Sequence, residues 1–188
     1  MIKNVALTTI ALILLTGCGS GGEDTGSSKP ITQTRLDKKY NLWSYMVPTA
    51  NSTHTFTHTQ NNKSSTYKTT YLVSDTRVTE VADYAQDEKT IYEKVNDEIN
   101  VKFEKSNKAN GLYKLFMTAD VGDVVTVRNS TCTLSRHFDN FNVPNSDKSF
   151  ADVIEITCNN IPGYYQKGVG EIAQIEDSAG KNIRVLSN

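Results

Sequence analysis

Regular alternation of apolar and polar side chains along short stretches is the feature of this sequence that most restricts its fold. Between residues 98 and 104, Ile99, Val101 and Phe103 alternate with charged or polar residues, so every second side chain points to one face of an extended strand. Residues 53–59 alternate in the same way, with threonine at every second position. No helical period persists for three turns. The pattern predicts β-strands with one apolar and one polar face.

Further stretches rich in Thr, Tyr, Val and Ile are typical of strands and are separated by turn residues. The predicted strands span residues 53–59, 65–74, 77–85, 90–95, 98–104, 112–117, 124–134, 151–158, 164–176 and 182–186. The predicted turns lie at residues 61–63, 96–97, 110–111, 121–123, 162–163 and 179–181. About ten short strands joined by short turns predict an all-β fold, with an antiparallel sheet that is curled or forms a half-open barrel.

The N-terminal segment has the layout of an export signal. Lys3 is followed by an apolar run over residues 5–15 and then by Leu15-Thr16-Gly17-Cys18. This run is too short to span a bilayer but fits the core of a signal peptide. The four-residue motif resembles the lipobox of bacterial lipoproteins, in which an aliphatic residue and two small residues precede the cysteine that becomes acylated. The alternatives are an ordinary signal peptide with a chance cysteine and a short buried helix.

The resemblance to bacterial lipoproteins implies processing by a signal peptidase of type II. Cleavage falls before Cys18, which then carries diacylglyceryl and an acyl group such as palmitate, and more than one chain makes the membrane anchor stable. Gly19 after the cysteine resembles the pattern that directs lipoproteins to the outer membrane, facing the periplasm or the cell surface, rather than the inner membrane. We therefore expect residues 1–17 to be a signal peptide.

Residues 19–29 are almost entirely Gly, Ser, Thr and charged residues, a composition typical of a flexible linker. The first aromatic cluster begins at Tyr40. We therefore predict a lipidated cysteine and linker over residues 18–39 and a single all-β domain over residues 40–188, a length that supports one hydrophobic core.

The charge of the exported chain excludes one class of partner. Removing residues 1–17 takes away Lys3, so the 20 basic residues become 19 against 21 acidic ones, a formal charge of −2. Nucleic-acid binding needs a basic stripe, so we expect no nucleic-acid partner. No later stretch approaches the ~18 apolar residues of a membrane span. The membrane partner is therefore expected through the lipid anchor alone.

Cys132 and Cys158 are the two cysteines that remain when Cys18 is acylated. An even pair in an oxidising compartment predicts a disulfide, either between neighbouring strands or between two sheets. A redox or metal-binding pair is the alternative. The wide spacing and the absence of a Cys-x-x-Cys motif argue against it.

The histidines do not indicate a metal site. His54 and His58 share a face of a predicted strand but lie about 13 Å apart along it, too far for both to reach one ion. We expect no metal and no cofactor.

The sequence contains no motif typical of a catalytic site. His137 precedes Asp139, but no Gly-x-Ser-x-Gly elbow accompanies them. Pairs of acidic residues, 87–88 and 97–98, lie at predicted turns, where solvated carboxylates are expected. We therefore expect no enzymatic activity, and a hydrolase stays open as an alternative that would need a cleft around two carboxylates.

Residues 164–172 read Tyr-Tyr-Gln-Lys-Gly-Val-Gly-Glu-Ile. This stretch resembles a Tyr-Tyr-x-x-Gly-Val-Gly-x-Ile/Val segment of small β-rich envelope lipoproteins, some of which have the half-barrel of the carriers LolA and LolB. The resemblance implies a curled sheet, and a carrier of lipid or another apolar ligand as one function. From the residues alone, paired glycines within a strand permit a bend or bulge. A purely structural bend is the alternative to a ligand-binding role.

Two hypotheses for the function are favoured over a hydrolase. The first is a non-catalytic module that binds an unknown ligand or envelope protein, and the second is a carrier or chaperone that holds an apolar ligand in the curled sheet. The candidate ligand face consists of Tyr67, Tyr71, Phe103 and Phe116, because several strands offer few other large side chains. The alternative is that these aromatic residues fill the interior themselves.

Overall fold

The computed structural model describes residues 39–105, 108–127, 132–176 and 182–188. The predicted signal peptide, the lipidation site Cys18 and all of the predicted linker except its last residue lie outside these residues.

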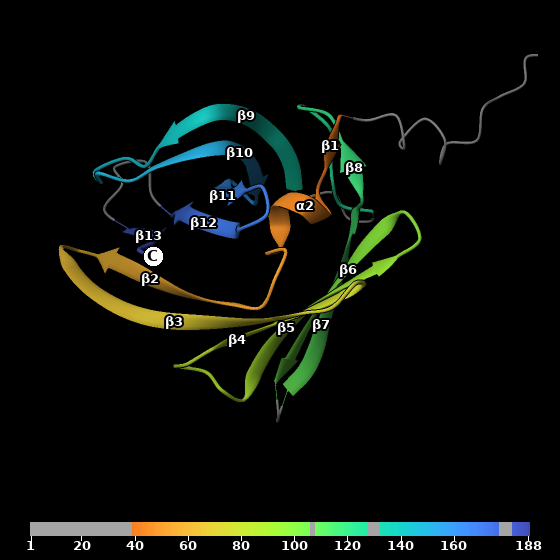
Figure 1. Cartoon of the computed structure of the whole chain (residues 1–188), viewed down its shortest axis with the longest axis horizontal. Helices are drawn as coiled ribbons and strands as arrows, with labels where there is room; N and C mark the ends of the chain where they lie inside the picture. Colours follow the sequence, from red (N-terminus) through yellow and green to blue (C-terminus); the bar gives the residue numbers. More distant parts are fainter. Residues whose placement is uncertain (1–38, 106–107, 128–131, 177–181) are drawn as a thin grey trace, which may run out of the picture.

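Within the described residues, eleven strands form one antiparallel sheet (Figure 1). The first half consists of β2 (Ser52–Gln60), β3 (Lys63–Val73), β4 (Arg77–Ala82), β5 (Glu88–Val95), β6 (Glu98–Lys105) and β7 (Lys108–Phe116). The second half consists of β9 (Cys132–Asn142), β10 (Ser149–Cys158), β11 (Ile161–Gln166), β12 (Gly170–Ile175) and β13 (Asn182–Leu186). Each half is a meander of consecutive strands, and the pairing of β13 with β2 joins them. The predicted all-β fold is confirmed.

Asparagines form several of the tight turns between strands. Asn61, Asn62 and Asn96 have φ between 50° and 62°, the left-handed region that asparagine tolerates better than most residues. They connect β2 to β3 and β5 to β6, as the sequence predicts. Asn159 and Asn160 make the turn between β10 and β11, with φ of 50° and 65°.

The sheet curls but is not closed, because its edge strands β7 and β9 do not pair with each other in the described residues. Between them, at one end, lies the segment 122–127. Phe116 N donates to Val125 O at 2.8 Å, and Val125 N donates to Cys132 O at 3.0 Å. The architecture is therefore a half-open barrel whose edges are connected at one end by irregular chain.

A short N-terminal segment covers the inner face of the curled sheet. It contains β1 (Tyr40–Asn41) and the single-turn helix α2 (Trp43–Met46), and β1 pairs with β8 (Thr118–Ala119). Figure 1 shows α2 between β12 and the β6–β7 side of the sheet. The core around this segment consists of Tyr40, Leu42, Tyr45, Met46, Val47, Tyr71, Val78, Ile99, Val101, Leu115, Ala119, Val125, Cys132, Leu134, Ile154 and Ile156. Strands from both halves of the sheet thus bury apolar side chains against one turn of helix.

Polar contacts tie α2 to the second half of the sheet. Tyr45 Oη donates to Asp152 Oδ1 at 2.6 Å, and His137 Nε2 lies 3.0 Å from the same oxygen. Although burial opposes ionisation, these hydrogen bonds and Lys167 hold the pKa of Asp152 below its ordinary value.

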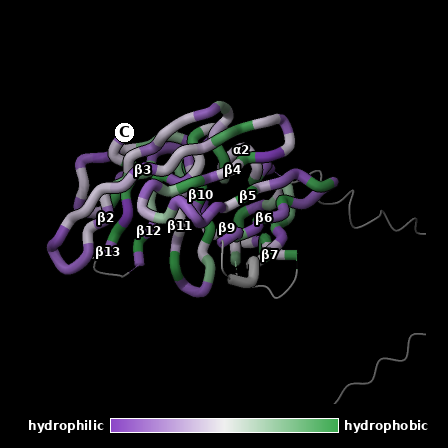
Figure 2. The backbone as a smooth tube through the Cα atoms, turned by 90° about the horizontal axis from the view of Figure 1, so that it is seen from below, coloured by the Kyte–Doolittle hydropathy of each residue, from purple (hydrophilic) through white to green (hydrophobic). Residues whose placement is uncertain are grey.

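The opposite face of the second half has a core of its own. Phe141, in the arched β9, stacks on Tyr164 with ring centroids 4.1 Å apart. Lys148 Nζ, beyond β9, donates to Ser187 O at 3.1 Å. The end of the β9–β10 hairpin therefore folds over β11–β13, and it buries Val153, Ala173 and other apolar residues. Figure 2 shows hydrophobic and hydrophilic stretches alternating along the backbone of the sheet.

The glycine-rich stretch lies in a turn, not inside one bent strand over residues 164–176 as predicted. Gly168 and Gly170 have φ of 77° and 94°, and the chain reverses there between β11 and β12. Gly168 N donates to Ser44 O at 2.6 Å and Gly168 O accepts from Thr49 N at 3.1 Å. This turn therefore positions α2. The bulge that the sequence suggested lies two residues later, at Ile172.

Other boundaries also differ from the prediction. The strand predicted over residues 124–134 begins instead at Cys132, because residues 124–127 form only isolated bridges to the two edge strands. The predicted turn at residues 110–111 lies within β7, and the one at 162–163 lies within β11. In both cases, pairing with a neighbouring strand overrides the local preference of Asn-Gly and Pro-Gly for a turn. Among the described residues, no helix is long and apolar enough to cross a membrane.

Candidate functional site

The register of the first meander places four residues in one row on the inner face. Tyr71 on β3 is opposite Glu80 on β4, Glu80 is opposite Thr90 on β5, and Thr90 is opposite Phe103 on β6. Residues directly opposite each other in antiparallel strands point to the same side. Because Tyr71 belongs to the core beneath α2, this row faces the interior of the curled sheet.

A second row on the inner face joins the two meanders. Tyr67 is opposite Phe56 on β2, and Phe56 is opposite Leu186 on β13. Two residues earlier on β13, Arg184 is opposite His58. The inner face therefore continues from the first meander into the second without interruption.

The β-bulge in β12 brings an acidic residue to this face. Tyr164 is opposite Ala173, but Tyr165 is opposite Glu171, so Ile172 is the additional residue. This shift reverses the alternation and directs Glu171 toward Arg184. Arg184 Nε donates to Glu171 Oε1 at 2.9 Å, and Nη2 contacts the same oxygen.

Arg184 is partly buried. Its guanidinium is 5.9 Å from the centre of the Phe56 ring. Burial disfavours the charge on Arg184, but the ion pair with Glu171 more than offsets it and holds the pKa of the guanidinium above its ordinary value. Arg184 and Glu171 therefore form a fixed pair of opposite charges.

Glu80, unlike Glu171, is not hydrogen-bonded to Arg184; its hydrogen-bond donor is a phenol. Tyr92 Oη donates to Glu80 Oε2 at 2.9 Å, and the residues opposite Glu80 are Tyr71 and Thr90. Burial, reinforced by the negative charge of Glu171, raises the pKa of Glu80 to about 7 although the hydrogen bond from Tyr92 favours the ionised form. Glu80 and Glu171 thus carry two negative charges against the single guanidinium of Arg184, which is hydrogen-bonded to Glu171, so the cluster has one excess negative charge when Glu80 is ionised.

Phenol groups surround these charges. Burial raises the pKa of Tyr71, Tyr92 and Tyr165, and the negative charge of Glu80 or Glu171 adds to the effect. These tyrosines stay neutral at physiological pH and act as hydrogen-bonding partners rather than as anions. Glu80, Glu171, Arg184 and the tyrosines together are called the carboxylate–tyrosine cluster below.

Two open clefts reach this cluster from solvent. The Glu80 cleft has a volume of about 380 Å³ and is lined by Glu80, Ala82, Tyr84, Ala85, Glu88, Lys89, Thr90, Phe103, Glu104 and Lys105. The Arg184 cleft has a volume of about 490 Å³ and is lined by His58, Ser65, Thr66, Tyr67, Tyr84, Glu176 and Arg184. Both volumes fall within the range of small-molecule sites. Tyr84, which is 70 % exposed and packs edge-on against Tyr67, contributes to both clefts.

The structure brings together three of the four aromatic residues of the predicted ligand face. Tyr67, Tyr71 and Phe103 lie on the inner face, whereas Phe116 follows the inward-facing Leu115 and so points to the opposite side. Tyr71 is only 3 % exposed and fills the core, while Phe103 is 46 % exposed and lines the Glu80 cleft. Tyr71 therefore fills the interior, whereas Phe103 and Tyr67 each border a cleft.

The histidines lie apart from one another. His54 is buried beside Tyr71, and burial lowers its pKa. His58 Nε2 is 2.9 Å from Asn182 Oδ1, and His137 contacts Asp152 near α2. In the described part of the chain, no three His, Cys, Asp or Glu residues are grouped so that they could hold a metal ion.

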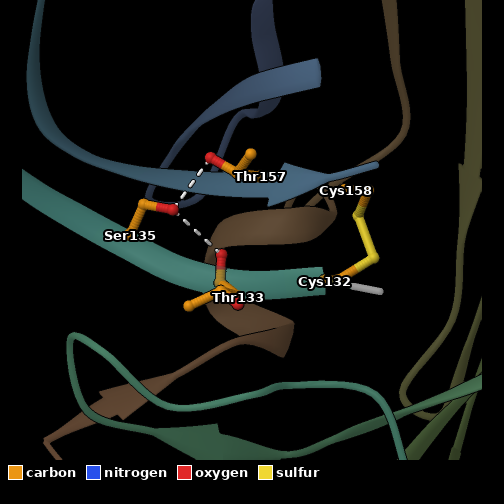
Figure 3. Close-up of a disulfide and its surroundings, with 5 residues drawn as sticks. All are labelled: Cys132, Thr133, Ser135, Thr157 and Cys158. Atoms are coloured by element: carbon orange, nitrogen blue, oxygen red, sulfur yellow. Dashed lines mark hydrogen bonds between the residues drawn. A yellow bond between two sulfur atoms is a disulfide. The ribbon is translucent and has the colours of Figure 1, made fainter. Parts of the chain in front are cut away.

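Cys132 and Cys158 form the predicted disulfide (Figure 3). They are directly opposite each other at the ends of β9 and β10, with Cα atoms 4.1 Å apart. The bridge is therefore of the cross-strand kind. On the other side of the same strands, Ser135 Oγ donates to Thr157 Oγ1 at 2.8 Å.

Comparison with protein-family models, with curated proteins and with solved structures found no match to this chain.

Sequence reasoning missed the charged members of the cluster. The position of Glu80 could have been predicted. It is two residues from both Val78 and Ala82, so the three side chains lie on the same, apolar side of the strand. The position of Arg184 could not have been predicted, because a polar residue between the apolar residues Ile183 and Val185 is expected on the solvated face of a strand. Glu171 reaches the inner face only through the bulge, which no local pattern specifies.

Proposed function

We propose that this protein is a lipid-anchored envelope lipoprotein whose curled sheet is a non-catalytic binding module. The observation that carries the proposal is the unequal filling of the inner face. The N-terminal segment fills one end with a compact apolar core, and the other end keeps two clefts on either side of Tyr84. Exposed aromatic side chains beside converging polar groups are typical of ligand sites.

The lipobox-like motif at Cys18 supports the location. A lipid anchor followed by a Gly- and Ser-rich linker holds the domain close to a membrane surface while leaving it free to turn. We place the protein at the outer membrane, facing the periplasm or the cell surface.

The geometry favours a polar or amphiphilic ligand over a purely apolar one. A carrier for acyl chains needs an apolar trough, but the apolar part of the inner face is occupied by Leu42, Tyr45 and Val47. The open part is lined by Glu80, Arg184 and other polar groups. A hydrolase would need two carboxylates free to act in one cleft. In the Glu80 cleft, Glu88 is paired with Lys105 and Glu104 lies opposite Lys89, so this arrangement favours binding over hydrolysis.

Native mass spectrometry tests the binding function. The full chain, purified from envelopes in a non-ionic detergent, is expected to retain a small molecule at one-to-one stoichiometry. A Tyr84→Asp variant should lose that molecule, and Tyr40→Phe, at a position that lines neither cleft, is the control that should retain it. A wild-type protein without any bound molecule, and without saturable binding of added envelope extract, contradicts the proposal.

A fluorescent fatty acid separates the carrier alternative from the proposed module. Saturable binding at micromolar concentration that is lost in Phe103→Asp, with unchanged circular dichroism, would establish the carrier. Weak binding that is equal in wild type and variant would agree with the polar-ligand module.

A further inference from the structure

The charged side chains around the Glu80 cleft leave one negative charge without a counterion. The lining contains the carboxylates Glu80, Glu88 and Glu104 and the ammonium groups Lys89 and Lys105. Lys105 forms an ion pair with Glu88, and Lys89 is directly opposite Glu104 in the β5–β6 ladder. Glu80 is left over, opposite Tyr71 and Thr90.

The rest of the cluster does not neutralise Glu80. Arg184 is bound to Glu171 through two nitrogen atoms and one carboxylate oxygen, so its charge is already matched. The groups that face Glu80 from the other packed strands are the phenols of Tyr71, Tyr92, Tyr113 and Tyr165. Phenols donate hydrogen bonds but supply no positive charge. Glu80 is partly buried. A partly buried carboxylate without a counterion is unfavourable, and a ligand cation at this point would reduce that cost.

Aromatic rings border the same space. Phe103 is 46 % exposed and Tyr84 is 70 % exposed, and both line the Glu80 cleft. The face of an aromatic ring attracts an alkylammonium group more than it attracts an anion. Metal cations such as Ca²⁺ or Mg²⁺ instead need six or more oxygen ligands, which one free carboxylate does not provide.

We infer that the Glu80 cleft binds the ammonium group of an organic cation, either a primary amine or a quaternary ammonium, between the Glu80 carboxylate and the rings of Tyr84 and Phe103. The inference rests on the proposed binding function and names the chemical class of its ligand. The cleft volume of about 380 Å³ accommodates a head group with a short chain.

Isothermal titration calorimetry with three probes of nearly equal shape tests the inference. Choline is the cationic probe, 3,3-dimethylbutanol is its neutral isostere, and 3,3-dimethylbutanoate is the anion. The full chain is held in a non-ionic detergent, since a zwitterionic one would present its own ammonium group. We expect choline to bind saturably and at least tenfold more tightly than either of the other probes.

Variants locate the site within the protein. Glu80→Gln should weaken choline binding at least tenfold, and Tyr84→Leu should weaken it several-fold. Glu98→Gln removes a carboxylate on β6, which is separated from β4 by β5. Glu98 pairs with Lys114 outside the cleft, so the substitution should leave binding unchanged. Circular dichroism and the melting temperature show that each variant is folded.

The pH dependence provides a second readout. Only ionised Glu80 attracts a cation, and its pKa in the free protein is about 7. The affinity for choline should therefore rise between pH 5.5 and 8, by no more than the factor that Glu80→Gln removes and at most about thirtyfold, and level off above that range. Choline itself does not titrate there, and in Glu80→Gln the affinity should be independent of pH.

The possible outcomes separate this inference from the proposed function. Equal binding of choline and its neutral isostere, or tighter binding of the anion, overturns the ammonium site but leaves a binding module. If no probe binds while native mass spectrometry still detects a retained molecule, the ammonium site is again overturned alone. If no probe binds and no molecule is retained, both proposals fail.

Discussion

A carboxylate loses hydrogen bonds to water when it is buried. At Glu80, hydrogen bonding from the hydroxyl group of Tyr92 replaces part of this hydration. Glu171, by contrast, is bound by Arg184 at 2.9 Å. The same residue type thus has two roles on one sheet face, because only one of the two positions has a guanidinium beside it. The difference makes the charge of Glu80 sensitive to pH in the neutral range.

Replacement of Glu80 should stabilise the protein at neutral and alkaline pH. The pKa of Glu80 is about 7 in the folded state and near 4.5 in the unfolded state, so the folded state binds this proton more tightly. The free energy of unfolding of the wild type therefore falls as the pH rises from about 4.5 to about 7. Glu80→Gln should remove this decline and be more stable at pH 8 by about 2 kcal/mol, less than the full pKa shift implies because some solvent reaches Glu80.

Urea unfolding at pH 5 and pH 8 measures this effect. Glu98→Gln is the matched control on the same sheet, and its difference from wild type should stay within about 0.5 kcal/mol at both values. An equal pH dependence in wild type and Glu80→Gln would show that Glu80 is not buried in the way described.

Among the secondary-structure elements, α2 depends on contacts far along the chain. A four-residue helix has no stability of its own, and it is held by the turn between β11 and β12 through Ser44 and Gly168. A Cβ atom added at Gly170 would lie 3.4 Å from Met46 O and from Pro48 Cδ. The turn and α2 are therefore close enough at this position for a Cβ atom to touch both Met46 and Pro48.

The pair Gly170→Ala and Gly122→Ala separates backbone strain from this contact. Both glycines have φ near 95°, but a Cβ atom at Gly122 meets nothing within 4 Å. Each substitution should lower the free energy of unfolding by about 1 kcal/mol, because alanine is strained at a positive φ. Gly170→Ala should lower the free energy of unfolding by about 0.5 kcal/mol more than Gly122→Ala, because the added Cβ atom lies at the near limit of van der Waals contact with Met46 O and Pro48 Cδ. A lower melting temperature of Gly122→Ala than of Gly170→Ala would contradict this contact.

The disulfide acts at the level of the β9–β10 hairpin. Cys132 and Cys158 are 26 residues apart in sequence. In the chain-entropy model, their bond lowers the entropy of the unfolded chain and so stabilises the folded protein by about 3.5 kcal/mol. The double variant Cys132→Ser/Cys158→Ser should therefore melt at a clearly lower temperature. Alkylation of the denatured, unreduced wild type should label neither residue. Full labelling of both would refute the bond in the exported protein.

For the molecule as a whole, the pairing of β2 with β13 is what makes one continuous sheet. It joins a meander formed by residues 52–116 to one formed by residues 132–186. Without this pairing the two halves would be separate sheets, and Arg184 and Glu171 would not face Glu80. The candidate site is therefore a product of contacts between segments about 100 residues apart.

Membrane attachment is a property of the whole chain that Cys18→Ser tests. The thiol of the lipobox cysteine is the acceptor for the lipid, so the variant should remain an unprocessed precursor and take up no labelled palmitate. Wild type should partition into the detergent phase after extraction. A Cys18→Ser variant that still incorporates palmitate and has the mature mass would contradict the lipoprotein assignment.

Local patterns were sufficient to predict much of the secondary structure. The alternation in residues 53–59 and 98–104 and the asparagines at residues 61–62 and 96 correctly predicted strands and turns, because these preferences act between near neighbours. The predictions failed at residues 110–111, 124–134, 162–163 and 164–176. At residues 110–111 and 162–163, hydrogen bonding to the neighbouring strands β6 and β10 outweighed the local preference for a turn.

The sequence by itself determined that the chain is an antiparallel all-β protein, and it indicated the disulfide, since strand periodicity and cysteine number are both local or countable properties. Only the tertiary structure decided that α2 fills one end of the curled sheet and that Glu80, Glu171 and Arg184 meet at the other. The physical reason is that the free energy of a buried charge depends on its surroundings. Those surroundings come from β3, β5, β12 and β13, which no local pattern brings together.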